Sequence, residues 1–138
     1  MTRLFQFQIL LSIWITSLST IQAEAQSPLV IYNDQLVNGF QDWSYTMRDF
    51  ANPSPTHAGG KSIAVTPTNN YGAISFHHTD LDTTAYTNFS FWINGGTNGG
   101  QLLQVYAELS EVSQGAYLLP SALVSNTWQQ FTDRKSVV

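Results

Sequence analysis

A tryptophan on the polar side of an alternating segment is the strongest chemical signal in this chain. In segment 86–94, Phe89, Phe91 and Ile93 occupy one set of alternate positions, and Trp92 occupies the other together with serine and asparagine residues. Because consecutive side chains of a strand point to opposite faces, Trp92 is predicted to stand on a polar surface. An indole flanked by amides and hydroxyls suits a neutral sugar, whose apolar C–H face lies on the ring while its hydroxyls form hydrogen bonds.

Two further segments have the same character. In segment 102–109 the apolar residues up to Leu109 take the core side and Tyr106 takes the polar side, and in segment 71–78 the polar side carries His77. If the three strands neighbour one another, one sheet face brings these residues together. The candidate ligand-binding residues are Trp92, Tyr106, His77, Asn94, Gln104 and Glu108, with Tyr71 on the same face.

A structural explanation exists for each of these aromatic residues. An outward tryptophan or tyrosine on a sandwich can simply be covered by a loop or by further strands. Trp43 and Tyr45 also alternate with polar residues, and core packing is the expected role of this pair.

Metal and catalytic chemistry have weaker support. His77 and His78 precede two aspartates, Asp80 and Asp82, but neighbouring strand residues point to opposite faces and cannot easily share one ion. The sequence contains no nucleophile elbow, zinc-binding His-Glu-x-x-His motif or phosphate-binding glycine loop. Glu108 and Glu111 could act as a glycosidase pair, but nothing in the sequence singles them out. A non-catalytic domain is therefore predicted.

The composition limits the partners and the architecture. The formal net charge is −4 at pH 7, and Arg48 and Lys61 are the only lysine or arginine residues between Gln26 and Thr132. No basic surface is available for nucleic acid or for an anionic membrane. The chain has no cysteine, so the domain depends on an ordinary apolar core.

Short alternating runs separated by turn residues dominate after residue 25, and no amphipathic helix is evident. Turn sequences such as Asn52-Pro53-Ser54-Pro55 stand between the runs. Strands are predicted at 29–32, 42–50, 61–66, 71–78, 86–94, 102–109, 116–119 and 128–131. This spacing predicts an all-β fold, an antiparallel β-sandwich of the jelly-roll type.

The two ends of the sequence differ in character from the middle. Residues 1–25 form a predicted secretory signal peptide, with an apolar run after Arg3 and an A-x-A cleavage motif at Ala23-Glu24-Ala25. The apolar run is shorter than the roughly 20 residues that span a bilayer, so no membrane insertion is expected after cleavage. The ending Asp133-Arg134-Lys135-Ser136-Val137-Val138 matches the translation of a common sequencing adapter. Residues 26–132 are therefore predicted to be a β-sandwich domain that is incomplete at its C-terminus, with exposed apolar surface and low solubility.

Six segments together carry a family resemblance, through their order and spacing. They are 29–34, 43–45, 57–65, 89–96, 99–105 and 127–132. The chain resembles secreted galactose-binding-like jelly-roll domains, similar to the carbohydrate-binding modules attached to polysaccharide-degrading enzymes. The resemblance implies an extracellular protein that binds a polysaccharide or another glycan. It also implies that Asn33 and Asp34 correspond to half of a structural calcium site, with no other cofactor.

Three functions follow from these expectations. The first is a fragment of a carbohydrate-binding module that recognises a neutral glycan by aromatic stacking and polar contacts. The second is an extracellular structural or adhesion module, in which the same aromatic face binds protein. The third is the N-terminal part of a glycan-active enzyme, with the catalytic residues in a further domain of the same polypeptide.

Overall fold

The computed structural model describes residues 26–110 and 112–134, and the predicted signal peptide lies outside these residues. Within them the chain forms eight β-strands and no helix. The strands are β1 (Gln41–Asp42), β2 (Met47–Asn52), β3 (Ser62–Thr66), β4 (Phe76–His77), β5 (Asn88–Asn94), β6 (Gln104–Leu109), β7 (Val112–Leu118) and β8 (Trp128–Arg134). No helix in the described part of the chain has the length and apolar character needed to cross a membrane.

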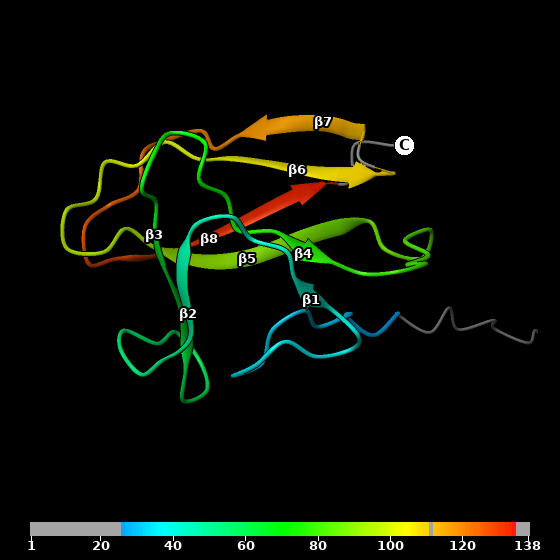
Figure 1. Cartoon of the computed structure of the whole chain (residues 1–138), viewed down its shortest axis with the longest axis horizontal. Coiled ribbons are helices and arrows are strands. Elements are labelled where there is room, and N and C mark those ends of the chain that lie inside the picture. Colours follow the sequence, from blue (N-terminus) through cyan, green and yellow to red (C-terminus); the bar gives the residue numbers. More distant parts are fainter. Residues whose placement is uncertain (1–25, 111, 135–138) are drawn as a thin grey trace, which may run out of the picture.

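The strands associate as four antiparallel pairs, namely β1 with β4, β2 with β3, β5 with β8, and β6 with β7. Figure 1 shows β6 and β7 along one edge of the molecule, β5 and β8 through its middle, and the β2–β3 hairpin running across the direction of β5. The predicted all-β, antiparallel class is confirmed, and the arrangement is consistent with a β-sandwich. The jelly-roll strand order stays a prediction.

The prediction of a first strand at residues 29–32 is wrong. Residues 29–32 form no ladder, and a single bridge joins Tyr32 to Leu36. The predicted strand 42–50 is divided into β1 and β2, because Thr46 turns inward between them and is only 7% exposed. Its hydroxyl donates a hydrogen bond to the carbonyl of Thr66 at 3.2 Å, which satisfies the buried polar group.

The best-buried apolar residues lie after β7. Leu119 is 2% exposed, and Leu123 packs close to Gly95, where a Cβ atom would meet the Leu123 side chain at 3.1 Å. The Phe91 and Phe131 rings stack across the β5–β8 ladder with centroids 5.8 Å apart. The inner face of β5 is therefore the one that the alternation predicts, although Phe89 at its outer end is partly exposed.

The burial predicted for β6 fails at its C-terminal end. Leu109 is expected on the core side but is 62% exposed. The residues before it, Ala107 and Glu108, are exposed as well, so both faces of β6 are open at this end of the hairpin. The register shift between Tyr106 and Glu108 places its extra residue in β7 and leaves the alternation of β6 itself unchanged. The β6–β7 hairpin carries exposed apolar side chains, among them Leu109, Val112 and Leu118. An incomplete domain and its low solubility stay predictions.

The end of β8 includes Asp133 and Arg134, which pair with Phe89 and Asn88. These are the first two residues of the segment whose sequence resembles an adapter. Backbone pairing does not test the origin of that sequence, so the adapter origin stays a prediction. The last four residues, 135–138, lie outside the described residues.

Candidate functional site

An exposed indole is built into the segment that joins β1 to β2. This segment runs antiparallel to the residues before β4, through hydrogen bonds from the Trp43 amide to the Ser75 carbonyl at 3.0 Å and from the Tyr45 amide to the Ala73 carbonyl at 3.1 Å. The Trp43 ring stacks on His77 with centroids 3.7 Å apart and an interplanar angle of 4°. Because Trp43 is nevertheless 56% exposed, much of the indole is open to a ligand.

The hydroxyl of Tyr45 connects this segment to β6. A hydrogen bond with Tyr45 raises the pKa of Tyr106, and the negative charge of Glu108 raises it further. Both tyrosines are exposed, Tyr45 to 59% and Tyr106 to 44%. Trp43, His77, Tyr45 and Tyr106 are called the Trp43 platform below.

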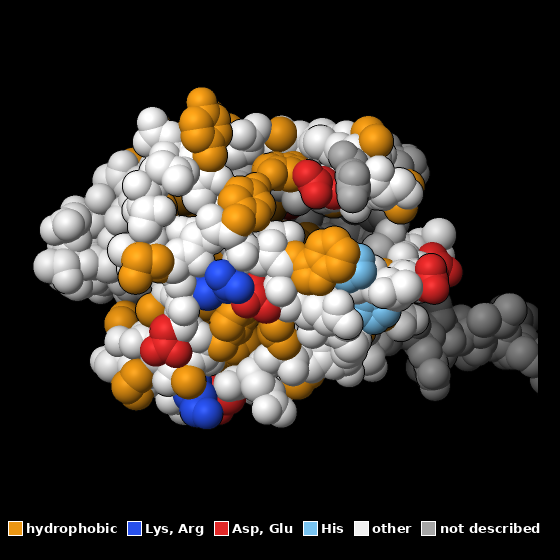
Figure 2. Space-filling model, viewed as in Figure 1, with side chains coloured by type: hydrophobic (Ala, Val, Ile, Leu, Met, Phe, Trp, Pro, Cys, Tyr) orange, Lys and Arg blue, Asp and Glu red, His pale blue; other side chains and the backbone are white. Residues whose placement is uncertain are grey.

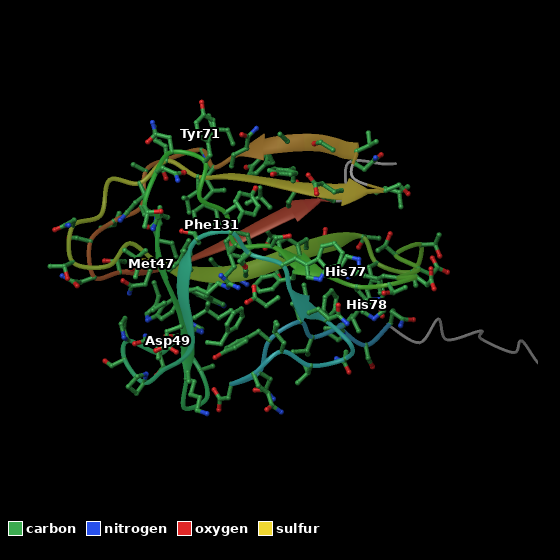
Figure 3. The ribbon with its side chains drawn as sticks, in the orientation of Figure 1. Met47, Asp49, Tyr71, His77, His78 and Phe131 are labelled. Atoms are coloured by element: carbon green, nitrogen blue, oxygen red, sulfur yellow. The ribbon has the colours of Figure 1, made fainter. Side chains whose placement is uncertain are left out.

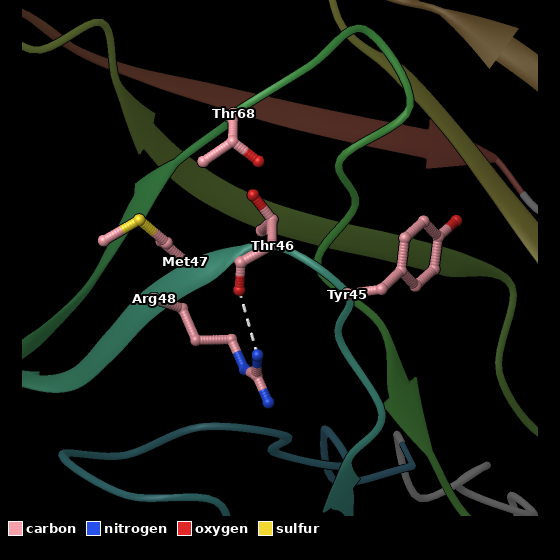
Figure 4. A pocket seen from close by; sticks show the side chains of 5 residues that line it. All are labelled: Tyr45, Thr46, Met47, Arg48 and Thr68. Carbon is pink, nitrogen blue, oxygen red and sulfur yellow. Dashed lines mark hydrogen bonds between the residues drawn. The ribbon is translucent and has the colours of Figure 1, made fainter.

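Figure 2 shows this side of the molecule. Hydrophobic side chains gather over the β1–β4 and β6–β7 ladders, with histidine and acidic side chains among them. Tyr45 also borders a shallow, open hollow of about 550 Å³, whose other lining residues are Thr46, Met47, Arg48 and Thr68. In Figure 4, Tyr45 and Met47 lie on either side of Thr46.

An ion pair fixes the polar border of the platform. The Arg48 guanidinium donates through Nε to the Asp42 carboxylate at 2.6 Å and forms a salt bridge to it through a second nitrogen. It also donates to the Thr46 carbonyl at 2.9 Å. Partial burial raises the pKa of Asp42, but hydrogen bonds from Arg48 and Ser44 outweigh it and lower the pKa. The pair is neutral as a whole, so it adds no net charge to the border.

The structure divides the predicted ligand-binding residues between two places. His77 and Tyr106 belong to the Trp43 platform, and Glu108 lies close to Tyr106. Trp92 instead stacks on His57, with ring centroids 3.9 Å apart. The single sheet face expected from the alternation is therefore not formed.

The remaining predicted residues lie outside the platform. The Asn94 carboxamide oxygen accepts a hydrogen bond from the Gly96 amide at 2.9 Å, which closes a turn after β5. Gln104 is exposed at the start of β6, two residues before Tyr106. Tyr71 is 86% exposed and lies well away from His77 (Figure 3). Glu111 lies outside the described residues.

His77 and His78 have separate surroundings, as the strand geometry predicts. The His77 ring stacks on Trp43, whereas the His78 ring meets the edge of Phe40 with centroids 5.0 Å apart. The Nε2 atom of His78 lies 3.1 Å from the Asn38 carbonyl. Among the described residues, no three histidine, cysteine or acidic side chains are grouped as metal ligands.

The Asp34 carboxylate is engaged by the loop that precedes β3. It accepts hydrogen bonds from the Gly60 amide at 3.0 Å and from the Lys61 amide at 2.8 Å, and these bonds lower its pKa. Asn33 is exposed beside it. Calcium takes six to eight oxygen ligands, so the Asp34 carboxylate would need several further oxygen ligands beside it to hold the ion. Calcium binding at Asn33 and Asp34 stays a prediction.

Sequence reasoning missed the two residues at the centre of the platform. Trp43 and Tyr45 were expected in the core, and both are exposed. Alternation alone cannot tell which face of a segment is buried when polar and aromatic residues alternate on both. No signal in the local sequence identifies Trp43 and Tyr45 as exposed, because their exposure depends on packing between distant segments.

The fold and this surface define an all-β domain with an exposed aromatic site. No protein-family model matches the chain. The chain is 34% identical over 107 residues to an endoglucanase of Dictyostelium discoideum. The match covers 72% of this chain and 15% of that protein, so the chain spans a small part of the length of this relative. The similarity relates this chain to a part of a carbohydrate-active protein.

Proposed function

We propose that this chain is a non-catalytic carbohydrate-binding module of a secreted protein and that it binds a neutral glucan. The exposed Trp43 indole carries the proposal, because it stacks on His77 and lies two residues from the exposed Tyr45, which is hydrogen-bonded to Tyr106. A pyranose ring presents an apolar C–H face to the indole and its hydroxyls to the neighbouring oxygen atoms.

The stacking of His77 on one face of the Trp43 ring favours this role. Because His77 holds the Trp43 ring in one orientation, little side-chain entropy is lost when a sugar covers the outer face. The phenol hydroxyls of Tyr45 and Tyr106 can donate to or accept from sugar hydroxyls. The Glu108 carboxylate lies near Tyr106 and can accept hydrogen bonds from the sugar hydroxyls.

The chemistry of the surface fits a neutral ligand of modest affinity. The cation of Arg48 is paired with Asp42 and is not available to bind an anionic sugar. An open aromatic platform also leaves most of a ligand in contact with water, so it recovers little free energy beyond the cost of association.

The similarity to an endoglucanase supports a glucan as the ligand class. The resemblance to galactose-binding-like domains and the predicted signal peptide support a module that works outside the cell, attached to further domains. Within this proposal the catalytic residues belong to another part of the full polypeptide, and structural calcium belongs to the complete domain.

Affinity electrophoresis tests the proposal. The purified chain is run through native gels that contain a soluble β-linked glucan, with bovine serum albumin as the reference. We expect its migration to be retarded in proportion to the glucan concentration, without release of reducing sugar during incubation. Unchanged migration in a panel of glucans contradicts glucan binding, and release of reducing sugar contradicts the non-catalytic role.

The exposed apolar residues of the β6–β7 hairpin favour a second candidate, an adhesion module that binds protein. Leu109, Val112 and Leu118 are each more than half exposed there, which is more typical of an interface than of a free surface. Soluble oligosaccharide competes with a glycan ligand and not with a protein bound at the hairpin, so competition separates the two functions.

A further inference from the structure

A second aromatic cluster is present on the β5–β8 ladder. His57 stacks on Trp92 with centroids 3.9 Å apart at 16°, and it meets Trp128 at 5.6 Å and 65°. Trp92 is 43% exposed and His57 is also exposed. These three residues, called the Trp92 cluster, share no member with the Trp43 platform. Both sites nevertheless use the same element, an indole stacked on an imidazole.

Strand register explains what surrounds this cluster. Trp92 lies opposite Gln130, and Trp128 lies opposite Asn94, on the face of the ladder away from Phe91 and Phe131. One step along the same face, Ser90 lies opposite Thr132. The nearest side chains on this face are therefore uncharged amides and hydroxyls, which suit the hydroxyl groups of a neutral sugar.

The loop before β3 holds His57 in place. The C-terminal end of this loop is fixed because Asp34 accepts hydrogen bonds from the backbone amides of residues 60 and 61. Both tryptophans lie on a regular ladder, in which seven residues of β5 pair with seven of β8. The rings are thus positioned before any ligand arrives, which lowers the cost of binding.

We propose that the Trp92 cluster is a second binding surface for the same neutral glucan, so that one chain holds a polymer at two places. The proposal rests on the proposed function of the Trp43 platform. Two weak surfaces on one chain raise the retention on a polymer far above that of either alone, since the second contact forms at high effective concentration.

Nuclear magnetic resonance of the indole N–H groups tests this in the Trp43→Ala variant of the full chain. The probe is a soluble β-1,4-linked glucose hexasaccharide. With the first surface removed, we expect the Trp92 and Trp128 signals still to shift and to saturate. On insoluble cellulose, Trp43→Ala and Trp92→Ala should each lower retention by at least about tenfold, because each removes one of the two contacts. Tyr71→Ala, an exposed aromatic residue outside both surfaces, is the matched control.

The outcomes separate the two proposals. If wild type binds the hexasaccharide but Trp43→Ala abolishes every shift, the second surface is refuted and the proposed function stands. If wild type binds no glucan, both are refuted. Where Trp92→Ala changes the circular dichroism spectrum, His57→Ala replaces it, because His57 is exposed. Unchanged retention of a folded His57→Ala variant then counts against the second surface.

Discussion

Removal of the Trp43 indole should weaken glucan binding while the fold persists. Trp43 is 56% exposed. For a side chain of about 200 Å² this leaves about 110 Å² for a ligand, and a sugar that covers one ring face buries about half of that area. At about 25 cal/mol per Å² the contact is worth about 1.4 kcal/mol, or about a tenfold change in affinity.

The same substitution also affects stability. The covered part of the ring, about 90 Å², contributes about 2 kcal/mol to folding, so Trp43→Ala should lower the melting temperature. Affinity is therefore measured by isothermal titration calorimetry well below the melting temperature of the variant, with Tyr71→Ala as the control. An affinity of Trp43→Ala within about twofold of wild type would refute the stacking role of this indole.

Three further substitutions test the structure around the site. Asp42→Asn should remove the part of the acid-induced loss of stability that comes from protonation of Asp42 in its ion pair with Arg48. The pKa of Asp42 is lowered, so the ion pair stabilises the fold at pH values above the ordinary carboxyl pKa of about 3.9, and this stabilisation is lost as the pH falls through the lowered pKa. Urea unfolding at several pH values measures the effect. If the free energy of unfolding depends on pH equally in Asp42→Asn and wild type, the prediction is contradicted. Gly95→Ala should cost about 1–3 kcal/mol, because the new methyl group meets the Val124 backbone; a melting temperature equal to that of wild type argues against this close contact. Asp34→Ala should increase amide hydrogen exchange at residues 60 and 61, whose N–H groups lose their acceptor. Equal protection of these amides in the variant and wild type speaks against the role of Asp34 in holding the loop before β3.

The sequence was sufficient to predict the class of fold and most of the strands. The strand predicted at 29–32 is absent, and the one predicted at 71–78 is reduced to β4 (Phe76–His77). Turn residues divide the chain at nearly the same points as the structure, and the alternation around Phe91 identifies the inner face of β5 correctly. It failed where side chains override the local pattern. Burial of Thr46 divides one predicted strand, and the end of the β6–β7 hairpin is exposed on both faces, which leaves Leu109 open to solvent.

The grouping of the site residues was not predictable. Tyr106 and His77 were expected beside Trp92, but they lie near Trp43, and Trp92 lies in another cluster because strand order decides which faces meet. Ligand binding by these residues stays a prediction. Period-two alternation assigns a residue to one of two faces of its own strand and carries no information about neighbouring strands. The exposure of Trp43 depends on packing between distant segments, which no local pattern records.

Intermolecular nuclear Overhauser effects between the ring protons of Trp43 and a bound glucan oligosaccharide test the central claim most directly. We predict contacts from the Trp43 ring to the C–H protons on one face of a single glucose unit, and their loss in Trp43→Ala. A bound oligosaccharide that shows no contact to Trp43, or contacts only to side chains outside the Trp43 platform, would contradict the proposed site.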